Sequence, residues 1–493
     1  MCPPGLIAAA VLLLGAIEPA STAEPERRVP LSVLFIAADD LRNDLGCYGN
    51  PIVRTPHIDC LAARGTVFEA AYCQQAVCNP SRASLLTGRR PDTLRIWDLP
   101  THFRSHHPRI VTLPQHFMRH GYHAEDVGKI FHNWKQSIEG DPESWSVPAV
   151  MHFGNHGADQ PQMAGPLPPD LVKTPRCEMR DVPDEAYLDG RIAARAVESL
   201  RESARRESPF FLAVGFWKPH APFNAPKRYW DLYDPATIPE PRHPEWPRGA
   251  PRIAWHDSQE ILREAASGLT REQARTIRHG YLAAVSYLDA QVGRVLDELE
   301  RLGLAERTIV VLWSDHGYHL GEQSLWAKTS NFELDARVPL VIAAPTVAAA
   351  GQRVATPVEL LDLYPTLVDL AGLPVPPGLE GRSLVPLLLD PDAPFKPAAL
   401  SQHPRPSYID RAPGGVPTAM GYSVRSCTHR YTEWRDWKTG ETTARELYDH
   451  VADPDESVNR AADPEQRDVV TRHASLLEAF QPLVKPGWTP AMP

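Results

Sequence analysis

The chain has 493 residues, of which 43% are hydrophobic, so it can bury a large core and general disorder is excluded. Its 51 prolines are about twice the usual share, which indicates many ordered loops. The formal net charge of −10 disfavours binding to nucleic acid or to an anionic membrane. A local basic pocket, rather than the overall field, must therefore hold any anionic substrate.

The first 23 residues have the pattern of a signal peptide. Residues 6–17 form an apolar run too short to span a bilayer comfortably, and residues 21–23 supply the small side chains of a cleavage site. We therefore predict export, to the periplasm or the medium, with no membrane span left after cleavage. The six cysteines that remain are sparse and indicate no disulfide framework. The chain has no N-glycosylation sequon, which fits a bacterial product.

Short continuous apolar runs recur along the chain. They lie at residues 33–38, 210–215, 309–313 and 338–344. Such runs are typical of strands that are buried on both faces of a parallel sheet. Helical patterns lie between them, with a long apolar stripe at residues 277–299. The alternation predicts an α/β fold, with a large doubly wound, mostly parallel sheet flanked by helices, which we assign to residues 30–390.

Two pairs of possible metal ligands follow predicted strands. Asp39 and Asp40 come after the first run, and Asp315 and His316 come after the third. Since ligands of such sheets bind beyond the carboxyl ends of the strands, we expect both pairs at one crevice. Adjacent like charges are costly unless a cation lies between them. Mostly oxygen donors favour Ca²⁺ over zinc, although an imidazole is unusual for calcium. Taken separately, a helix cap and a turn explain the two pairs equally well.

Residues 78–88, Cys-Asn-Pro-Ser-Arg-Ala-Ser-Leu-Leu-Thr-Gly, predict a short helix. Pro80 fits its first turn, and Gly88 can end it in a left-handed cap. Cys78 then lies at the helix N-terminus, where free N–H groups favour an anion, and Arg82 can direct its planar guanidinium to the same point. The pattern suits a tetrahedral oxyanion beside residue 78, but a small buried hydrophobic cysteine explains it about as well.

Three basic segments follow predicted strand ends or the Asp315-His316 pair. They contain Lys129 and His132, Lys218 and His220, and Lys328. A single Lys or His on a loop is usually only solvated, but these three segments can reach one crevice and bind an anion there. Residues 98–190 and 235–270 are rich in Pro, His and Trp with weak periodicity, so we expect mainly active-site loops and insertions.

The pattern changes after about residue 390. Residues 422–425 and 429–434 alternate like half-exposed strands, and a Lys-Thr-Gly-Glu turn follows. A helix is expected near residues 464–480. We therefore predict a smaller α+β subdomain with an antiparallel sheet over residues 391–493.

The pattern Cys-x-Pro-Ser-Arg followed by Leu-Thr-Gly-Arg closely resembles the signature of the sulfatases, a family within the alkaline phosphatase superfamily. Other segments appear in sulfatase order and resemble the iduronate-2-sulfatase-like branch in particular. They lie at residues 89–93, 127–132, 211–220 and 314–328. The loops at 140–185 and 235–270, which would shape a sugar pocket, differ from that branch.

The resemblance implies a sulfuric ester hydrolase acting on a sulfated carbohydrate, with a uronic acid 2-O-sulfate as the first candidate and glycosaminoglycan degradation as its setting. In that family a maturation enzyme oxidises the signature cysteine, here Cys78, to formylglycine, whose aldehyde hydrates to a geminal diol. One diol hydroxyl attacks sulfur, and the second then expels sulfate and restores the aldehyde. The residues implied to hold one Ca²⁺ are Asp39, Asp40, Asp315, His316 and the modified Cys78.

The resemblance also assigns roles to the basic residues. His220 protonates the leaving oxygen, with Lys328 nearby, and His132 deprotonates the second hydroxyl. Arg82 and Lys129 steady the modified residue, and the two lysines bind the sulfate charge.

Two other functions stay open at this point. A phosphatase or phosphodiesterase of the same superfamily commonly has Ser or Thr as its nucleophile and two zinc ions, which Cys78 and the single apparent metal set disfavour. A non-catalytic glycan-binding scaffold would keep the fold and lose the chemistry, whereas every candidate position here holds a competent residue.

Overall fold

The computed structural model describes residues 30–132, 136–151, 177–256, 260–261, 268–345, 347, 350–409 and 415–480. The predicted signal peptide at residues 1–23 lies outside the described residues, as do parts of the two loop-rich stretches. Within the described ranges, no helix combines the length and the apolar character needed to cross a membrane.

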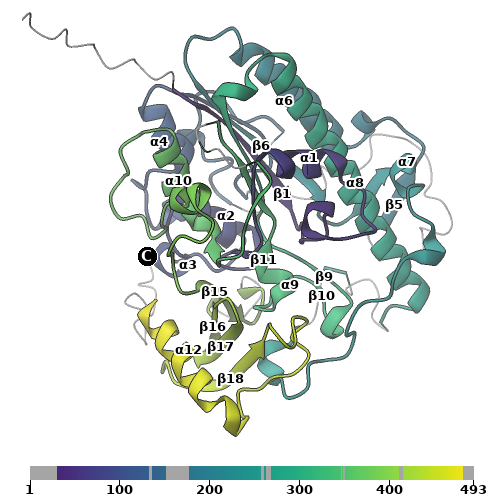
Figure 1. The fold of residues 1–493 in the computed structure, drawn as a ribbon, viewed down its shortest axis with the longest axis vertical. Coiled ribbons are helices and arrows are strands. Elements are labelled where there is room, and N and C mark those ends of the chain that lie inside the picture. Colours follow the sequence, from purple (N-terminus) through teal and green to yellow (C-terminus); the bar gives the residue numbers. More distant parts are fainter. Residues whose placement is uncertain are drawn as a thin grey trace, which may run out of the picture.

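A seven-stranded sheet forms the centre of the molecule (Figure 1), in the order β13-β2-β12-β8-β1-β6-β4. In chain order its strands are β1 (Ser32–Asp39), β2 (Thr66–Phe68), β4 (His123–Gly128), β6 (Phe210–Pro219), β8 (Thr308–Ser314), β12 (Leu340–Ala343) and β13 (Gln352–Val354). The neighbours β4, β6, β1 and β8 all run parallel, which confirms the mostly parallel α/β sheet.

One strand of the expected parallel set runs the other way. β12, which contains most of the apolar run at residues 338–344, is antiparallel to both β8 and β2. The sequence could not distinguish the two directions, because a strand covered on both faces is apolar throughout in either.

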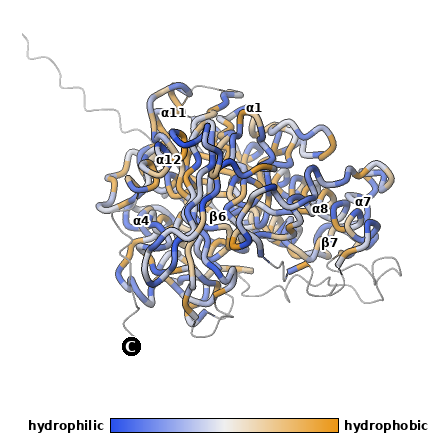
Figure 2. Tube along the Cα trace, turned by 90° about the horizontal axis from the view of Figure 1, so that it is seen from below, coloured by the Kyte–Doolittle hydropathy of each residue, from blue (hydrophilic) through white to orange (hydrophobic). Residues whose placement is uncertain are grey.

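Both faces of the sheet are covered by helices, because successive side chains of a strand point to opposite sides. Phe35 of β1 packs into one apolar core and its neighbour Ile36 into the other. The core around Ile36 includes α1 (Pro56–Arg64), α6 (Leu188–Ser203) and α8 (Arg271–Arg301). The core around Phe35 includes α2 (Cys78–Thr87), α4 (Leu113–Arg119), α10 (Leu363–Leu370) and α11 (Val385–Leu389). Figure 2 shows β6 between α4 on one side and α8 on the other.

The remaining elements are short. They are β3 (Ala71–Tyr72), β5 (Cys177–Arg180), β7 (Phe223–Pro226), β9 (His319–Leu320), β10 (Trp326–Ala327), β11 (Arg337–Val338), β14 (Val358–Glu359), α3 (Pro91–Leu94), α7 (Lys227–Trp230) and α9 (Glu333–Ala336). The stretch 98–190 is less loop-rich than expected, since α4 and the sheet-edge strand β4 lie within it.

A separate four-stranded antiparallel sheet lies towards the C-terminus, drawn in yellow-green in Figure 1. It comprises β15 (Ala399–Arg405), β16 (Ala419–Arg425), β17 (His429–Asp436) and β18 (Thr442–Asp449), and α12 (Arg467–Ala479) packs on it. Its first strand joins the segment that leads to α2. The Gln402 N–H donates to the Gln74 carbonyl at 2.8 Å, and the Ser401 hydroxyl donates to the Cys73 carbonyl at 2.6 Å.

Candidate active site

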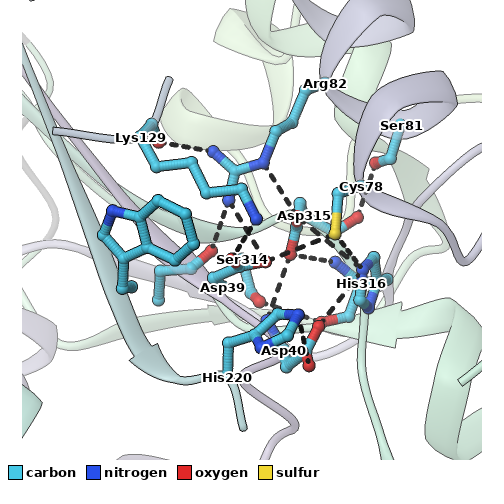
Figure 3. A network of polar contacts seen from close by, with 12 residues as sticks. Asp39, Asp40, Cys78, Ser81, Arg82, Lys129, His220, Ser314, Asp315 and His316 are labelled. Atoms are coloured by element: carbon cyan, nitrogen blue, oxygen red, sulfur yellow. Dashed lines mark hydrogen bonds and ion pairs between the residues drawn. The ribbon is translucent and has the colours of Figure 1, made fainter. Parts of the chain in front are cut away.

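Four neighbouring parallel strands end at the same edge of the central sheet, and each supplies polar side chains there. β1 ends in Asp39, with Asp40 next, and β8 leads into Asp315. β6 ends just before His220, and β4 ends just before Lys129. Figure 3 shows these side chains facing one another around Cys78. The sheet thus brings together residues that are far apart in the sequence.

Cys78 is the first residue of α2, as predicted, and all ten residues of this helix are buried. Gly88 ends the helix with a φ of 66°, in the left-handed region. The Cys78 Sγ lies 3.5 Å from Oδ1 of Asp39 and 3.4 Å from Nε2 of His316. Burial, and then the charge of Asp39, raise the pKa of this thiol well above its usual range. The unmodified thiol therefore stays protonated and is a weak nucleophile.

The acidic residues form a compact and fully buried group. Nε2 of His316 lies 3.3 Å from Oδ1 of Asp40 and 3.7 Å from Oδ2 of Asp315. The backbone N–H of Asp40 donates to Oδ1 of Asp315 at 3.2 Å. Ser314 helps to hold this arrangement, because its hydroxyl donates to the His316 carbonyl and accepts from the Leu41 N–H, both at 2.9 Å.

Asp40 has a φ of 64°, which is uncommon for a residue other than glycine. Tyr281 of α8 stabilises this turn through its hydroxyl group. Its hydroxyl donates to the Asp40 carbonyl at 2.8 Å and accepts from the Arg42 N–H at 3.0 Å. A side chain of the long helix thus fixes the direction in which the Asp40 carboxylate points.

Arg82 lies one turn into α2, and its hydrogen bonds go to the acidic group and to backbone carbonyls. Nε donates to Oδ2 of Asp315 at 2.8 Å, and Nη2 lies 3.6 Å from Oδ1 of Asp39. Nη1 donates to the carbonyls of Lys129 and Ile130. The guanidinium therefore connects α2 with β1, β8 and the segment after β4.

Two lysines lie on opposite sides of the acidic group. Lys129 pairs with Asp39 and lies over the ring of Trp217, 4.7 Å from its centre. Lys328 donates to both carboxylate oxygens of Asp40, at 2.8 and 3.0 Å. Both ammonium groups are buried. The positive charges of the pair make the surroundings of Cys78 suitable for an anion.

The two histidines predicted to transfer protons, His220 and His132, lie at different places. Nε2 of His220 is 3.1 Å from Nζ of Lys328 and 3.6 Å from Oδ2 of Asp40, so it belongs to the cluster. His132 is buried three residues beyond Lys129, on the segment whose carbonyls bind Arg82. Its predicted role as a base stays a prediction.

The pKa values of the two adjacent carboxyls, Asp39 and Asp40, are shifted in opposite directions. Burial alone would raise the pKa of Asp39, but Lys129, followed by His220 and Arg82, outweighs it and holds this pKa well below the usual range. Burial raises the pKa of Asp40 well above the usual range even though Lys328 opposes it. The protein's own cations thus favour the charged form of Asp39 more than that of Asp40, and a further cation beside Asp40 would favour its charged form too.

The donor set fits a hard divalent cation. Single ligand atoms of Asp39, Cys78, Asp315 and His316 all lie within 4.8 Å of one another. Asp40 adds a third carboxylate beside His316. Burial lowers the pKa of His316, which keeps its imidazole neutral and able to act as a ligand. Oxygen donors dominate, as calcium prefers.

Sequence reasoning missed Glu260, whose Oε1 lies 3.3 Å from Nε2 of His220 and whose Oε2 lies 3.3 Å from Nζ of Lys328. It lies in the stretch 235–270, expected to hold active-site loops, but no motif distinguishes it there. Trp217 and Tyr281 were also missed as neighbours of the site. Trp217 directly precedes Lys218, the first residue of the basic segment that the sequence did single out.

Comparison with known proteins identifies the family. The sulfatase family model matches residues 32–373, and the model described as N-sulphoglucosamine sulphohydrolase, C-terminal, matches residues 321–482. The first match covers more than half of the chain. The chain therefore belongs to the sulfatase family and is an enzyme that hydrolyses sulfate esters.

Its relatives show which sulfatases the chain resembles. It is 37% identical to iduronate 2-sulfatase from Homo sapiens over 509 residues, which cover 89% of this chain and 92% of the relative. Its fold matches that of a protein solved with its substrate D-glucosamine-2-N,6-O-disulfate, with a TM-score of 0.72, 21% identity and coverage of 92% and 100%. A 2-O glycosaminoglycan sulfatase matches with a TM-score of 0.66, 25% identity and coverage of 92% of each chain. The chain is thus similar to iduronate 2-sulfatase, as predicted.

Proposed function

We propose that this sulfatase removes a uronic acid 2-O-sulfate from a sulfated saccharide, using a formylglycine made from Cys78 and a bound Ca²⁺. The position of Cys78 carries this proposal, because the residue opens a wholly buried helix and contacts both Asp39 and His316. The similarity to iduronate 2-sulfatase and to a 2-O glycosaminoglycan sulfatase supports the choice of ester.

Formylglycine and Ca²⁺ would each supply one kind of chemistry. Formylglycine would provide the hydrated aldehyde as nucleophile, in place of a thiol that its surroundings keep protonated. Ca²⁺, held by Asp39, Asp40, Asp315 and His316 together with residue 78, would act as a Lewis acid on a sulfate oxygen.

The chain's own basic groups have separate tasks in this proposal. Lys129 and Lys328 bind the sulfate charge from the two sides of the cluster. His220 donates a proton to the leaving oxygen as its imidazolium. Its Nδ1–H is bonded to the Ala221 carbonyl at 2.5 Å, and its Nε2–H, which lies 3.3 Å from Oε1 of Glu260, is the proton that it gives up. Arg82 keeps Asp315 and the Lys129 segment in place for these steps.

The proposal extends to processing and location. An apolar run at residues 6–17 with small residues before position 24 supports export to the periplasm or the medium. A formylglycine-generating maturation enzyme is the partner that the mechanism requires. The division into a catalytic domain at residues 30–390 and a C-terminal subdomain at 391–493 stays a prediction.

Mass spectrometry of the tryptic peptide that ends at Arg82 tests the modification directly. Protein made beside its own maturation system should contain an aldehyde or its hydrate at residue 78, and Cys78→Ala protein should be inactive with the fold retained. An unmodified thiol in active protein would overturn the proposed mechanism.

Defined sulfated disaccharides test the choice of ester. Matched 2-O-, 6-O- and N-sulfated uronate-containing disaccharides, with a phosphate ester as a further control, should rank with the 2-O-sulfate first. Preference for another position would overturn the assignment of the ester, and preference for the phosphate would overturn sulfate hydrolysis.

A further inference from the structure

A second cleft lies at the opposite end of α2 from Cys78. Its volume is about 500 Å³, within the range of saccharide- and cofactor-sized sites. With a rise of 1.5 Å per residue, the ten residues of α2 separate it from Cys78 by roughly 15 Å. The cleft is therefore distinct from the site described above. It is lined by Arg89, Thr93, Leu94, His106, His107, Pro108, Arg109 and Ile110.

The charge of this cleft is opposite to that of the chain. Four of its eight lining residues are basic and none is acidic, although the chain carries 61 acidic and only 51 Lys and Arg residues. Arg89 donates to the neutral carbonyl of Pro377 at 3.3 Å, and Nε2 of His107 lies 2.9 Å from the neutral carbonyl of Thr93. In both contacts the partner is a carbonyl and not a carboxylate.

The positive charge of the cleft belongs to its two arginines, Arg89 and Arg109. Burial, and then Arg95 and His107, lower the pKa of His106, which favours its neutral imidazole as a hydrogen-bonding group on the rim. One carboxylate, Glu380, contacts a lining residue from outside the lining, since it accepts from the Thr93 hydroxyl at 2.7 Å and from the Arg90 N–H.

The cleft also has an apolar wall. Leu94 is fully buried beneath it, and Pro108 and Ile110 supply further apolar surface. A charged rim over an apolar wall matches a sugar ring, which has an apolar face and here would carry sulfate or carboxylate groups. A free inorganic anion would use only the rim.

One continuous segment connects the cleft with the catalytic centre. The side-chain amide of Asn79, the residue after Cys78, donates to the carbonyls of Asp98 and Thr101, both at 2.8 Å. The chain then continues directly into residues 106–110, which line the cleft. Residues 98–110 thus run from the neighbour of Cys78 on α2 to the cleft.

We propose that this cleft binds an anionic stretch of the saccharide chain whose ester lies at Cys78, so that longer substrates are held at two points. The inference rests on the proposed function in so far as the substrate is a sulfated saccharide. It predicts that the cleft affects the KM of long substrates and leaves the turnover of a disaccharide unchanged.

The test uses Arg109→Glu combined with His106→Ala, because both side chains are exposed and lie outside the catalytic cluster. Arg307→Glu is the matched control, since Arg307 is exposed at the start of β8, the end opposite to Asp315. For a sulfated hexasaccharide, kcat/KM of the double variant should fall about tenfold through KM. For the disaccharide it should change less than about twofold, and the control should match the unchanged protein. Equal loss on both substrates, or no loss on either, would overturn the proposal.

A binding measurement separates this proposal from the proposed function. Fluorescence anisotropy with a size-graded set of labelled heparin oligosaccharides is carried out on Cys78→Ala protein, with and without the cleft substitutions. Tighter binding of long chains that disappears with the cleft substitutions supports the site, even if no sulfated disaccharide is hydrolysed. Length-independent binding refutes the site even if the disaccharide is a good substrate.

Discussion

Replacement of Arg82 by lysine should destabilise the fold by disconnecting the ends of several strands. The guanidinium is fully buried and donates to Oδ2 of Asp315 at 2.8 Å. It also donates to the carbonyls of Lys129 at 2.6 Å, Ile130 at 3.2 Å and Ala38 at 3.3 Å. These acceptors belong to three segments, and two of these lie on neighbouring strands, since Ala38 is in β1 and Asp315 follows its partner β8.

Arg82→Lys keeps the charge but replaces a planar fork by a single ammonium group that cannot reach all of these acceptors. Each buried acceptor left without a partner costs about 1–3 kcal/mol. Two or three such losses sum to about 2–9 kcal/mol. The loss found when a buried ion pair is broken, about 3–5 kcal/mol, lies within this range, and we take it as the expected value.

Urea unfolding followed by tryptophan fluorescence measures this loss, with Arg307→Lys as an exposed control. The midpoint of Arg82→Lys should shift to lower urea by an amount equivalent to about 3–5 kcal/mol, while the control stays within about 0.5 kcal/mol. A loss below about 1 kcal/mol for Arg82→Lys would show that the hydrogen bonds of the guanidinium are not what holds these segments together.

Two further substitutions test the surroundings of the site and the C-terminal sheet. Tyr281→Phe removes the hydroxyl that holds the Asp40 turn and should weaken Ca²⁺ binding about 10- to 100-fold in calorimetric titration; unchanged affinity would contradict the role of Tyr281. Burial raises the pKa of Glu446 from 4.5 to about 7, although Trp434 and Tyr448 donate to it, so its contribution to stability is greatest below pH 4.5 and is lost as the pH rises towards 7. Glu446→Gln should therefore gain about 2–3 kcal/mol relative to the unchanged protein between pH 5 and pH 8, and a difference independent of pH would refute this.

The sequence predicts the catalytic edge well because two simple rules apply there. Continuous apolar runs mark the interior strands, and parallel strands end at one edge, so Asp39 and Asp315 had to lie near each other. The helix at Cys78 was equally readable, since Pro80 and Gly88 define its two ends. Both predictions use information that is local in the chain.

The missed features depend on contacts that no local pattern records. Strand β15 was not predicted, because it carries buried polar residues in place of an apolar run. One of them, Arg405, donates to the Thr329 carbonyl, beside Lys328, at 3.1 Å. Such polar strands are stabilised by partners from distant segments, which the sequence around them does not reveal.

The burial of α2 determines when residue 78 can be altered chemically. Only 3% of Cys78 is exposed, and every other residue of the helix is also buried. A modifying enzyme must bind the chain around its target residue, so it requires this segment in an extended form. In the folded protein, extending the segment would open most of the core around Phe35. Any conversion of Cys78 must therefore take place on the newly made chain, before folding is complete. Under the proposed mechanism, a molecule that folds first keeps its thiol, and the active fraction of a preparation is then set during biosynthesis rather than by conditions applied afterwards.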